Sequence, residues 1–279
     1  GNIQSVTDYT GGGGGGGNLK TFGGLPLTTS LTCVTDTCGN VSPLLLSTCY
    51  VTNYGNGGIT TNTVFGNNAL SANTTGSQLS AFGNNALKCN TTGVLNSAFG
   101  NCALMNNTTG LMNLALGGKA LEKNTTANFN VAVGHYSMNN STTGAANTAI
   151  GQGAMYLSTT GSQNAVLGND AMYYSCLGCR NTAIGTCSLY VNACGHCNVA
   201  VGFQSAFNTF TGSFNTAIGT ASLFSNNASC VTAVGYLAGF GNTTGINNTF
   251  VGSRAGCKNS TGGCLTIIGT DAGFCNTTG

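Results

Sequence analysis

The feature that most constrains this chain is a 17-residue period that covers most of its length. A glycine preceded by apolar or small residues recurs thirteen times, and every interval but one is 17 residues. We number each copy from residues 147–163, NTAIGQGAMYLSTTGSQ, with Asn147 as position 1 and the recurring glycine as position 5. The position-5 glycines are Gly66, Gly83, Gly100, Gly117, Gly134, Gly151, Gly168, Gly185, Gly202, Gly219, Gly235, Gly252 and Gly269.

The length of the repeat decides the fold class. Helical hairpin repeats need about 33 residues or more, so a 17-residue unit is too short for one. Glycines at positions 5 and 15 are suited to corner conformations, and the recurring Asn-Thr-Thr-Gly is turn chemistry. The pattern therefore predicts an all-β fold, a single-chain parallel β-solenoid (β-roll) of about thirteen coils, with short strands that pair with the coils above and below.

Position 4 is apolar in all thirteen copies, and position 8 is Ala or Ser in each. A coil of this perimeter encloses one layer of side chains, so we expect the position-4 column and the small position-8 residues to form the interior. Such an interior has no room for a substrate. The position-4 residues are Phe65, Phe82, Phe99, Leu116, Val133, Ile150, Leu167, Ile184, Val201, Ile218, Val234, Val251 and Ile268.

Residues 1–60 have a different composition from the repeats. They contain a seven-glycine run, Gly11 to Gly17, and both prolines of the chain, Pro26 and Pro43. We interpret residues 1–60 as a small Gly-rich docking or cap module and residues 61–279 as the solenoid domain. Because the chain ends inside repeat sequence, we expect the last coil to contact the N-terminal module of another copy, head to tail.

The repeats resemble those of a known class of fibrous proteins. NTAIGQGAMYLSTTGSQ, NTAIGTCSLYVNACGHC and NTVFGNNALSANTTGSQ are similar to the tandem repeats of tail-fibre-type proteins of phages and bacteria, which read close to NTAIGxxALxxNTTGxx. A more distant similarity links them to the head repeats of trimeric autotransporter adhesins. The resemblance covers residues 62–279 and implies a fibrous, oligomeric, surface-binding protein.

Charge is scarce, with seven basic and five acidic residues among 279. The basic residues form no cluster that could neutralise several phosphates, which argues against nucleic-acid binding. The longest nearly apolar stretch, near residues 44–51, is too short to span a membrane. Neither His135 nor His196 has a nucleophile and an acid at a recognisable spacing, and the acidic residues are scattered. We therefore expect a protein that is not an enzyme and needs no cofactor.

The fourteen cysteines favour an oxidising, extracellular location. Two Cys-x-x-Cys-like pairs, Cys176 with Cys179 and Cys194 with Cys197, could be zinc ligands. Their 18-residue offset also places them on adjacent coils, which favours disulfides Cys176–Cys194 and Cys179–Cys197. The same offset predicts Cys257–Cys275, and free or intermolecular thiols are the third interpretation.

N-x-S/T acceptor motifs recur with the repeat. Each would be a glycan site in a eukaryotic secretory route, although a repeat that contains Asn-Thr-Thr copies the motif automatically. The candidates are Asn73, Asn90, Asn107, Asn124, Asn242, Asn259 and Asn276.

Position 10 becomes aromatic in the later copies. It is the neighbour of a large position-9 residue such as Met155 or Leu189, and the two cannot both fit a narrow interior. One of them should therefore face a partner; the alternative is a repacked core. The interface candidates at position 10 are Tyr156, Tyr173, Tyr190, Phe207 and Phe224.

Together these features predict a structural subunit of an extracellular filament or adhesive surface fibre. Its partners would be copies of itself and a cell-surface or glycan receptor. The main alternative is an ice-binding solenoid, because Thr pairs repeat at positions 13 and 14, for example Thr74-Thr75 and Thr91-Thr92. Adjacent threonines point to opposite faces of a strand, so only one of these columns could be presented flat.

Overall fold

The structure is a computed structural model that describes residues 32–35, 41–46 and 59–278. The chain divides into two compact units, Gly1–Asn53 and Tyr54–Gly279. In the first unit, β1 (Thr32–Thr35) pairs antiparallel with β2 (Val41–Leu46). The seven-glycine run lies outside the described residues, as does most of the expected docking or cap module.

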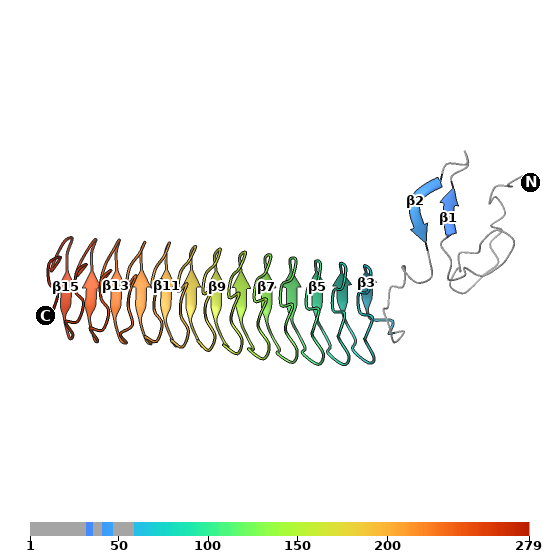
Figure 1. Ribbon diagram of the computed structural model, residues 1–279, viewed down its shortest axis with the longest axis horizontal. Coiled ribbons are helices and arrows are strands. Elements are labelled where there is room, and N and C mark those ends of the chain that lie inside the picture. Colours follow the sequence, from blue (N-terminus) through green and yellow to red (C-terminus); the bar gives the residue numbers. More distant parts are fainter. Residues whose placement is uncertain (1–31, 36–40, 47–58, 279) are drawn as a thin grey trace, which may run out of the picture. The chain divides into compact units, whose positions relative to one another are not determined.

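The second unit is a parallel β-solenoid, as the repeat predicted (Figure 1). Thirteen three-residue strands, each covering positions 2–4 of its copy, lie side by side in one sheet in sequence order. Neighbouring strands pair in register, so that Thr148 lies opposite Ala165 and Ile150 opposite Leu167. No helix occurs among the described residues. The strands are β3 (Thr63–Phe65), β4 (Ser80–Phe82), β5 (Ser97–Phe99), β6 (Leu114–Leu116), β7 (Val131–Val133), β8 (Thr148–Ile150), β9 (Ala165–Leu167), β10 (Thr182–Ile184), β11 (Val199–Val201), β12 (Thr216–Ile218), β13 (Thr232–Val234), β14 (Thr249–Val251) and β15 (Thr266–Ile268).

The rest of each coil is made almost entirely of turns rather than a second long strand. Positions 7, 9 and 17 have positive φ in nearly every copy, as in Leu87 (φ 50°) and Leu95 (φ 59°). Backbone hydrogen bonds nevertheless continue from coil to coil. The Leu87 N–H donates to the Ala103 carbonyl at 3.0 Å, and the Cys89 N–H donates to the Met105 carbonyl at 2.9 Å. Turns of one coil thus bond to turns of the next, which stabilises a shape that a single coil could not hold.

The prediction that position 4 faces inward is wrong. Side chains alternate along a strand, and it is position 3 that points inward, so positions 2 and 4 both point out. Ala149 at position 3 is 0% exposed, whereas Ile150 at position 4 is 38% exposed. The core consists of position 3, which is usually Ala, the small position 8 and the large position 9. A narrow interior accepts one large side chain per coil, and position 9 provides it.

Near the C-terminal end of the solenoid, the large core side chain moves from position 9 to position 3. Position 9 becomes Gly239 and Gly256, while position 3 becomes Phe250, which is 0% exposed. A Cβ built on Gly239 would lie 2.6 Å from Phe250 Cδ2, and one on Gly256 would also overlap that ring. The Phe250 ring therefore takes the space that position-9 side chains would fill in these two coils.

Two columns of buried asparagines line the inner corners. At position 12, Asn107 donates from Nδ2 to Asn90 Oδ1 of the preceding coil at 2.8 Å and to the Gly110 carbonyl at 3.0 Å. At position 1, Asn147 donates from Nδ2 to the Gly161 carbonyl at 2.8 Å. Its backbone N–H also donates to Asn130 Oδ1 at 3.0 Å. The amides thus satisfy corner groups that the backbone alone would leave unpaired.

Glycine recurs at the two corner positions, 5 and 15, for different physical reasons. At position 5, Gly151 has φ +140°, which L side chains rarely adopt, and a Cβ there would lie 2.6 Å from Gly168 C. At position 15, glycine is favoured by close approach rather than by a positive φ. A Cβ on Gly161 would lie 2.5 Å from the Gly178 carbonyl oxygen. The expectation of special corner conformations is therefore correct for position 5 and wrong for position 15.

Candidate functional site

The outer face of the thirteen-stranded sheet is one candidate site. Its position-4 side chains form an unbroken apolar rank, which includes Leu116 (47% exposed) and Ile218 (40% exposed). Phe82 and Phe99 in this rank stack with ring centroids 5.0 Å apart. The neighbouring position-2 rank is mixed, with Thr in seven copies, Ser in two and Leu, Val or Ala in the others. Neither rank contains a charged residue.

The second candidate site is the aromatic column at position 10. The structure places position 9 in the core and position 10 outside it, half-buried, as one of the two interpretations predicted. The rings stack from coil to coil: Tyr156 on Tyr173 at 5.0 Å, Tyr173 on Tyr190 at 5.5 Å, and Phe207 on Phe224 at 4.9 Å. Phe240 continues the column at 5.0 Å from Phe224, so it does not repack the core.

Stacking covers the faces of these rings. Partial burial raises the pKa of the Tyr173 and Tyr190 phenols, with smaller contributions from neighbouring tyrosines and Asp170. The column therefore presents ring edges to solvent, and the Tyr173 and Tyr190 hydroxyls remain protonated around neutral pH.

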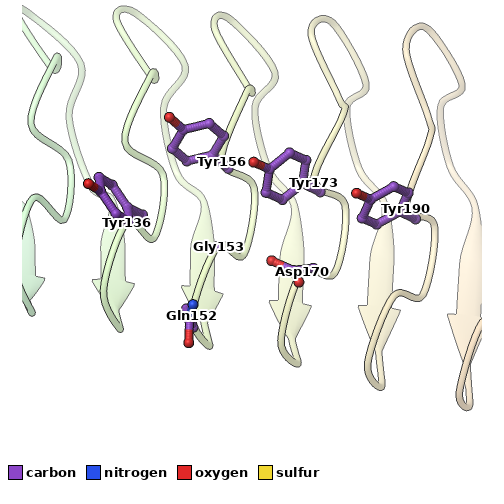
Figure 2. A pocket seen from close by; sticks show the side chains of 7 residues that line it. All are labelled: Tyr136, Gln152, Gly153, Tyr156, Asp170, Tyr173 and Tyr190. Atoms are coloured by element: carbon purple, nitrogen blue, oxygen red, sulfur yellow. The ribbon is translucent and has the colours of Figure 1, made fainter.

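A cavity of about 400 Å³ opens beside the column where position 7 is Gly153 (Figure 2). Gly153 is the only glycine at position 7 in the thirteen copies. The carboxylate of Asp170, at position 7 of the next coil, lies beside it and accepts a hydrogen bond from Asn169 Nδ2 at 2.7 Å. Besides Gly153 and Asp170, the lining residues are Tyr136, Gln152, Tyr156, Tyr173 and Tyr190.

The repeat pattern pointed to the three tyrosines of the column but not to the other four lining residues. Position 7 varies from copy to copy, so it carries no repeat signal. The available clue was the single glycine in that column, followed one coil later by one of the five acidic residues of the chain.

The predicted disulfides Cys176–Cys194, Cys179–Cys197 and Cys257–Cys275 are not formed in this structure, in which all six residues are free thiols. The physical reason is the register, because coils stack at an offset of 17 residues and cysteines 18 apart fall in different columns. The Cys179 N–H, for example, donates to Nδ1 of His196 at 3.1 Å, one residue before Cys197. Within the described ranges, no three His, Cys, Asp or Glu side chains gather closely enough to hold a metal ion.

The glycosylation candidates lie in the position-12 asparagine column. Six of the seven side chains are buried. The Nδ2 of Asn90, for example, donates to Asn73 Oδ1 at 2.9 Å and to the Gly93 carbonyl at 3.1 Å. In these buried cases the amide nitrogen is used within the fold, and the motif recurs with the asparagine that caps this corner. Asn276 is the exception in being partly exposed.

The threonines considered for ice binding differ between the two positions. Position-13 hydroxyls are used within the fold: Thr91 Oγ1 donates to the Thr108 carbonyl of the next coil at 3.0 Å. Position 14 is exposed and is threonine in six successive copies, from Thr75 to Thr160. The one copy with 16 residues, 215–230, is shortened in this same turn. Asn226 Nδ2 donates to the Ala228 carbonyl two residues later, whereas Asn107 donates to the Gly110 carbonyl three residues later.

Among the described residues there is no helix of the length and apolar character that a membrane-spanning segment requires. Comparisons of the chain with models of protein families, with curated proteins and with solved structures gave no match.

Proposed function

We propose that this chain is a structural subunit of an extracellular filament or adhesive surface fibre, in which solenoids associate side by side through the outer sheet face. The observation that carries the proposal is the apolar position-4 rank on the outside of the sheet. Monomeric soluble proteins rarely expose long contiguous apolar patches, and flat uncharged sheet surfaces invite association.

The dimensions of the face suit a contact with a second copy. Thirteen strands at about 4.8 Å spacing and three residues of about 3.3 Å each give a face of about 58 by 10 Å. Two such faces in contact would bury on the order of 1,200 Å² in total, the lower end of the range for specific interfaces. A second copy also has the same spacing between coils, so the two surfaces match coil for coil.

Charge supports the same partner. Only 12 residues of the chain are charged and none lies in ranks 2 or 4, so no repulsion opposes contact between two sheet faces. An acidic or basic partner would gain no electrostatic attraction from this surface. The resemblance to tail-fibre-type repeats supports the fibrous role, and the cysteine-rich, charge-poor composition supports the extracellular location.

The experiment compares lysine substitutions on two surfaces of the solenoid. Ile184→Lys with Ile218→Lys would place charges in the position-4 rank. Thr109→Lys with Thr143→Lys would place the same charges in the exposed position-14 column. Sedimentation velocity over a range of concentrations should show that the wild-type protein and the threonine variant associate, whereas the isoleucine variant remains monomeric. Equal association of both variants would refute the sheet face as the contact.

Ice binding is the second candidate, supported by the exposed position-14 column from Thr75 to Thr160. One threonine per coil at about 4.8 Å gives a regular array of hydroxyl and methyl groups. The neighbouring position-13 hydroxyls are donated to backbone carbonyls, so the array is a single column wide. Thermal hysteresis that is lost in Thr109→Lys with Thr143→Lys would favour this function over the structural one.

A further inference from the structure

Near its C-terminal end, the solenoid shows how positions 7 and 10 on adjacent coils bind a cation. Arg254 is at position 7 of one coil, and Asp271 and Phe274 are at positions 7 and 10 of the next. Arg254 Nη2 lies 2.6 Å from Asp271 Oδ2, and the guanidinium lies 5.6 Å from the centroid of the Phe274 ring. The guanidinium is thus paired with a carboxylate and lies over an aromatic ring.

Gly153, Asp170 and Tyr173 occupy the same three places elsewhere in the solenoid. Gly153 stands where the arginine would be, Asp170 corresponds to Asp271, and Tyr173 corresponds to Phe274. A Cβ built on Gly153 would overlap Asp170 Oδ1 and would lie 3.5 Å from Tyr173 Cδ2. A side chain at this position would therefore start against the Asp170 carboxylate, which would have to shift, and in contact with the Tyr173 ring.

We propose that the cavity beside Gly153 binds a guanidinium group supplied by another molecule. The cavity takes the place of the missing side chain, and its volume of about 400 Å³ leaves ample room for that group. Asp170 supplies the negative charge, and Tyr173 supplies the aromatic ring. Guanidinium groups combine carboxylate pairing with aromatic contact, which makes them the best match to this pair of residues.

The surroundings of the cavity leave the Asp170 charge available. The one ion pair in the described part of the chain is Arg254–Asp271, so Asp170 has no cationic partner there. Its neighbours are uncharged: Asn169 donates a hydrogen bond to it, and Gln152 and the tyrosine hydroxyls can donate to a ligand. A cation does lie near the opposite wall of the cavity, where the Lys119 ammonium is 5.5 Å from the centroid of the Tyr136 ring.

The contact between position 7 and the position-10 ring of the next coil also occurs at Tyr136 and Tyr156, whose centroids are 5.7 Å apart at 89°. It is therefore a property of the coil geometry and not of the C-terminal copies alone. Tyr136 closes one side of the cavity, and Figure 2 shows Asp170 across from it beyond Gly153. A planar cation entering the cavity is thus bounded by tyrosine and by the carboxylate.

The test is a titration of the full chain with Nα-acetyl-L-arginine amide, followed by NMR of ring-labelled tyrosines. The matched neutral probe is Nα-acetyl-L-citrulline amide, and the lysine analogue compares an ammonium with a guanidinium. We expect the arginine probe to shift the Tyr156 and Tyr173 signals at roughly millimolar concentration, because one exposed ion pair and one ring contact give modest affinity. The citrulline probe should cause no saturable shift, and the lysine probe should bind more weakly than the arginine probe.

Three variants make the test specific. Asp170→Asn should weaken binding of the arginine probe roughly two- to fivefold, since the exposed ion pair is removed. Gly153→Arg should abolish binding by filling the cavity from within. Arginine fits the backbone here, because Gly153 has φ +64° and Arg254 has φ 57° at the same repeat position. Asp271→Asn is the control and should leave probe binding unchanged.

Equal binding of the arginine and citrulline probes would overturn the proposal, as would unchanged binding in Asp170→Asn or Gly153→Arg. Circular dichroism of each variant establishes that the solenoid is folded. The titration is independent of the proposed fibre, because it reads a local site on each chain whether or not chains associate.

Discussion

At the scale of single residues, the buried amides explain why asparagine recurs at the corners. Asn107 donates to Asn90 and to Gly110 and accepts from Asn124 Nδ2 at 2.7 Å. The Asn107 amide thus joins neighbouring coils and closes its own turn. A side chain with no polar atoms would lose both functions, and one with only acceptors could no longer donate to Asn90 or to Gly110.

We predict that Asn107→Leu lowers the free energy of unfolding by at least about 2 kcal/mol, because it leaves several buried polar groups without partners. Asn107→Asp should be no better at neutral pH, since a carboxylate cannot donate to the Gly110 carbonyl. Urea denaturation monitored by circular dichroism measures the change. The exposed Asn101→Leu is the control and should shift stability by less than about 0.5 kcal/mol.

The inward and outward positions can be distinguished by one matched pair of leucines. Leu121 at position 9 is 0% exposed, and Leu116 at position 4 of the same copy is 47% exposed. Leu121→Ala should cost about 2–5 kcal/mol by creating a cavity, whereas Leu116→Ala should cost well under about 1 kcal/mol in the monomer. Equal losses in urea denaturation would contradict the assignment of the core.

At the scale of the coil, the repeat length and its glycines were sufficient to predict the parallel solenoid and its thirteen strands. They did not identify which side of the strand faces in. Position 4 is the most hydrophobic column. Because side chains alternate along a strand and the interior is narrow, the core is formed instead by the alanines at position 3 and the large side chains at position 9. The usually small position 3, which is Ala in nine of the thirteen copies, was the physical signal.

The candidate site was less predictable than the fold. The stacked column from Tyr156 onward follows directly from the period, so sequence could place it outside once position 9 filled the core. The cavity beside Gly153 depends instead on one copy differing from the rest. The predicted disulfides are not formed in this structure for a related reason, because a one-residue offset changes the column and direction of a side chain.

The exchange of core volume between positions 3 and 9 is testable in the C-terminal coils. Phe250→Ala should cost about 3–5 kcal/mol, since position 9 is glycine in that copy and in the one before it. Adding Gly239→Leu and Gly256→Leu should recover much of this loss. Leucine already adopts φ near 50° at position 9 elsewhere, as Leu87 does. The same two leucines introduced beside an intact Phe250 should destabilise the fold by overpacking.

At the scale of the whole molecule, stability and association have separate origins. Each coil contacts its neighbours, so the stability of a solenoid is approximately a sum over coils and interfaces between them. The outer sheet face contributes little to that sum, and yet it carries thirteen apolar residues in line. We propose that contact with another copy, rather than the stability of the single solenoid, explains a surface with this composition.

The most direct test of this account is electron cryo-microscopy of the associated wild-type protein, resolved well enough to orient each solenoid. The account predicts that sheets of neighbouring copies face each other about 10 Å apart, with position-4 side chains such as Ile184 and Ile218 between them. Assemblies in which the sheet faces remain in solvent while copies touch elsewhere would contradict it.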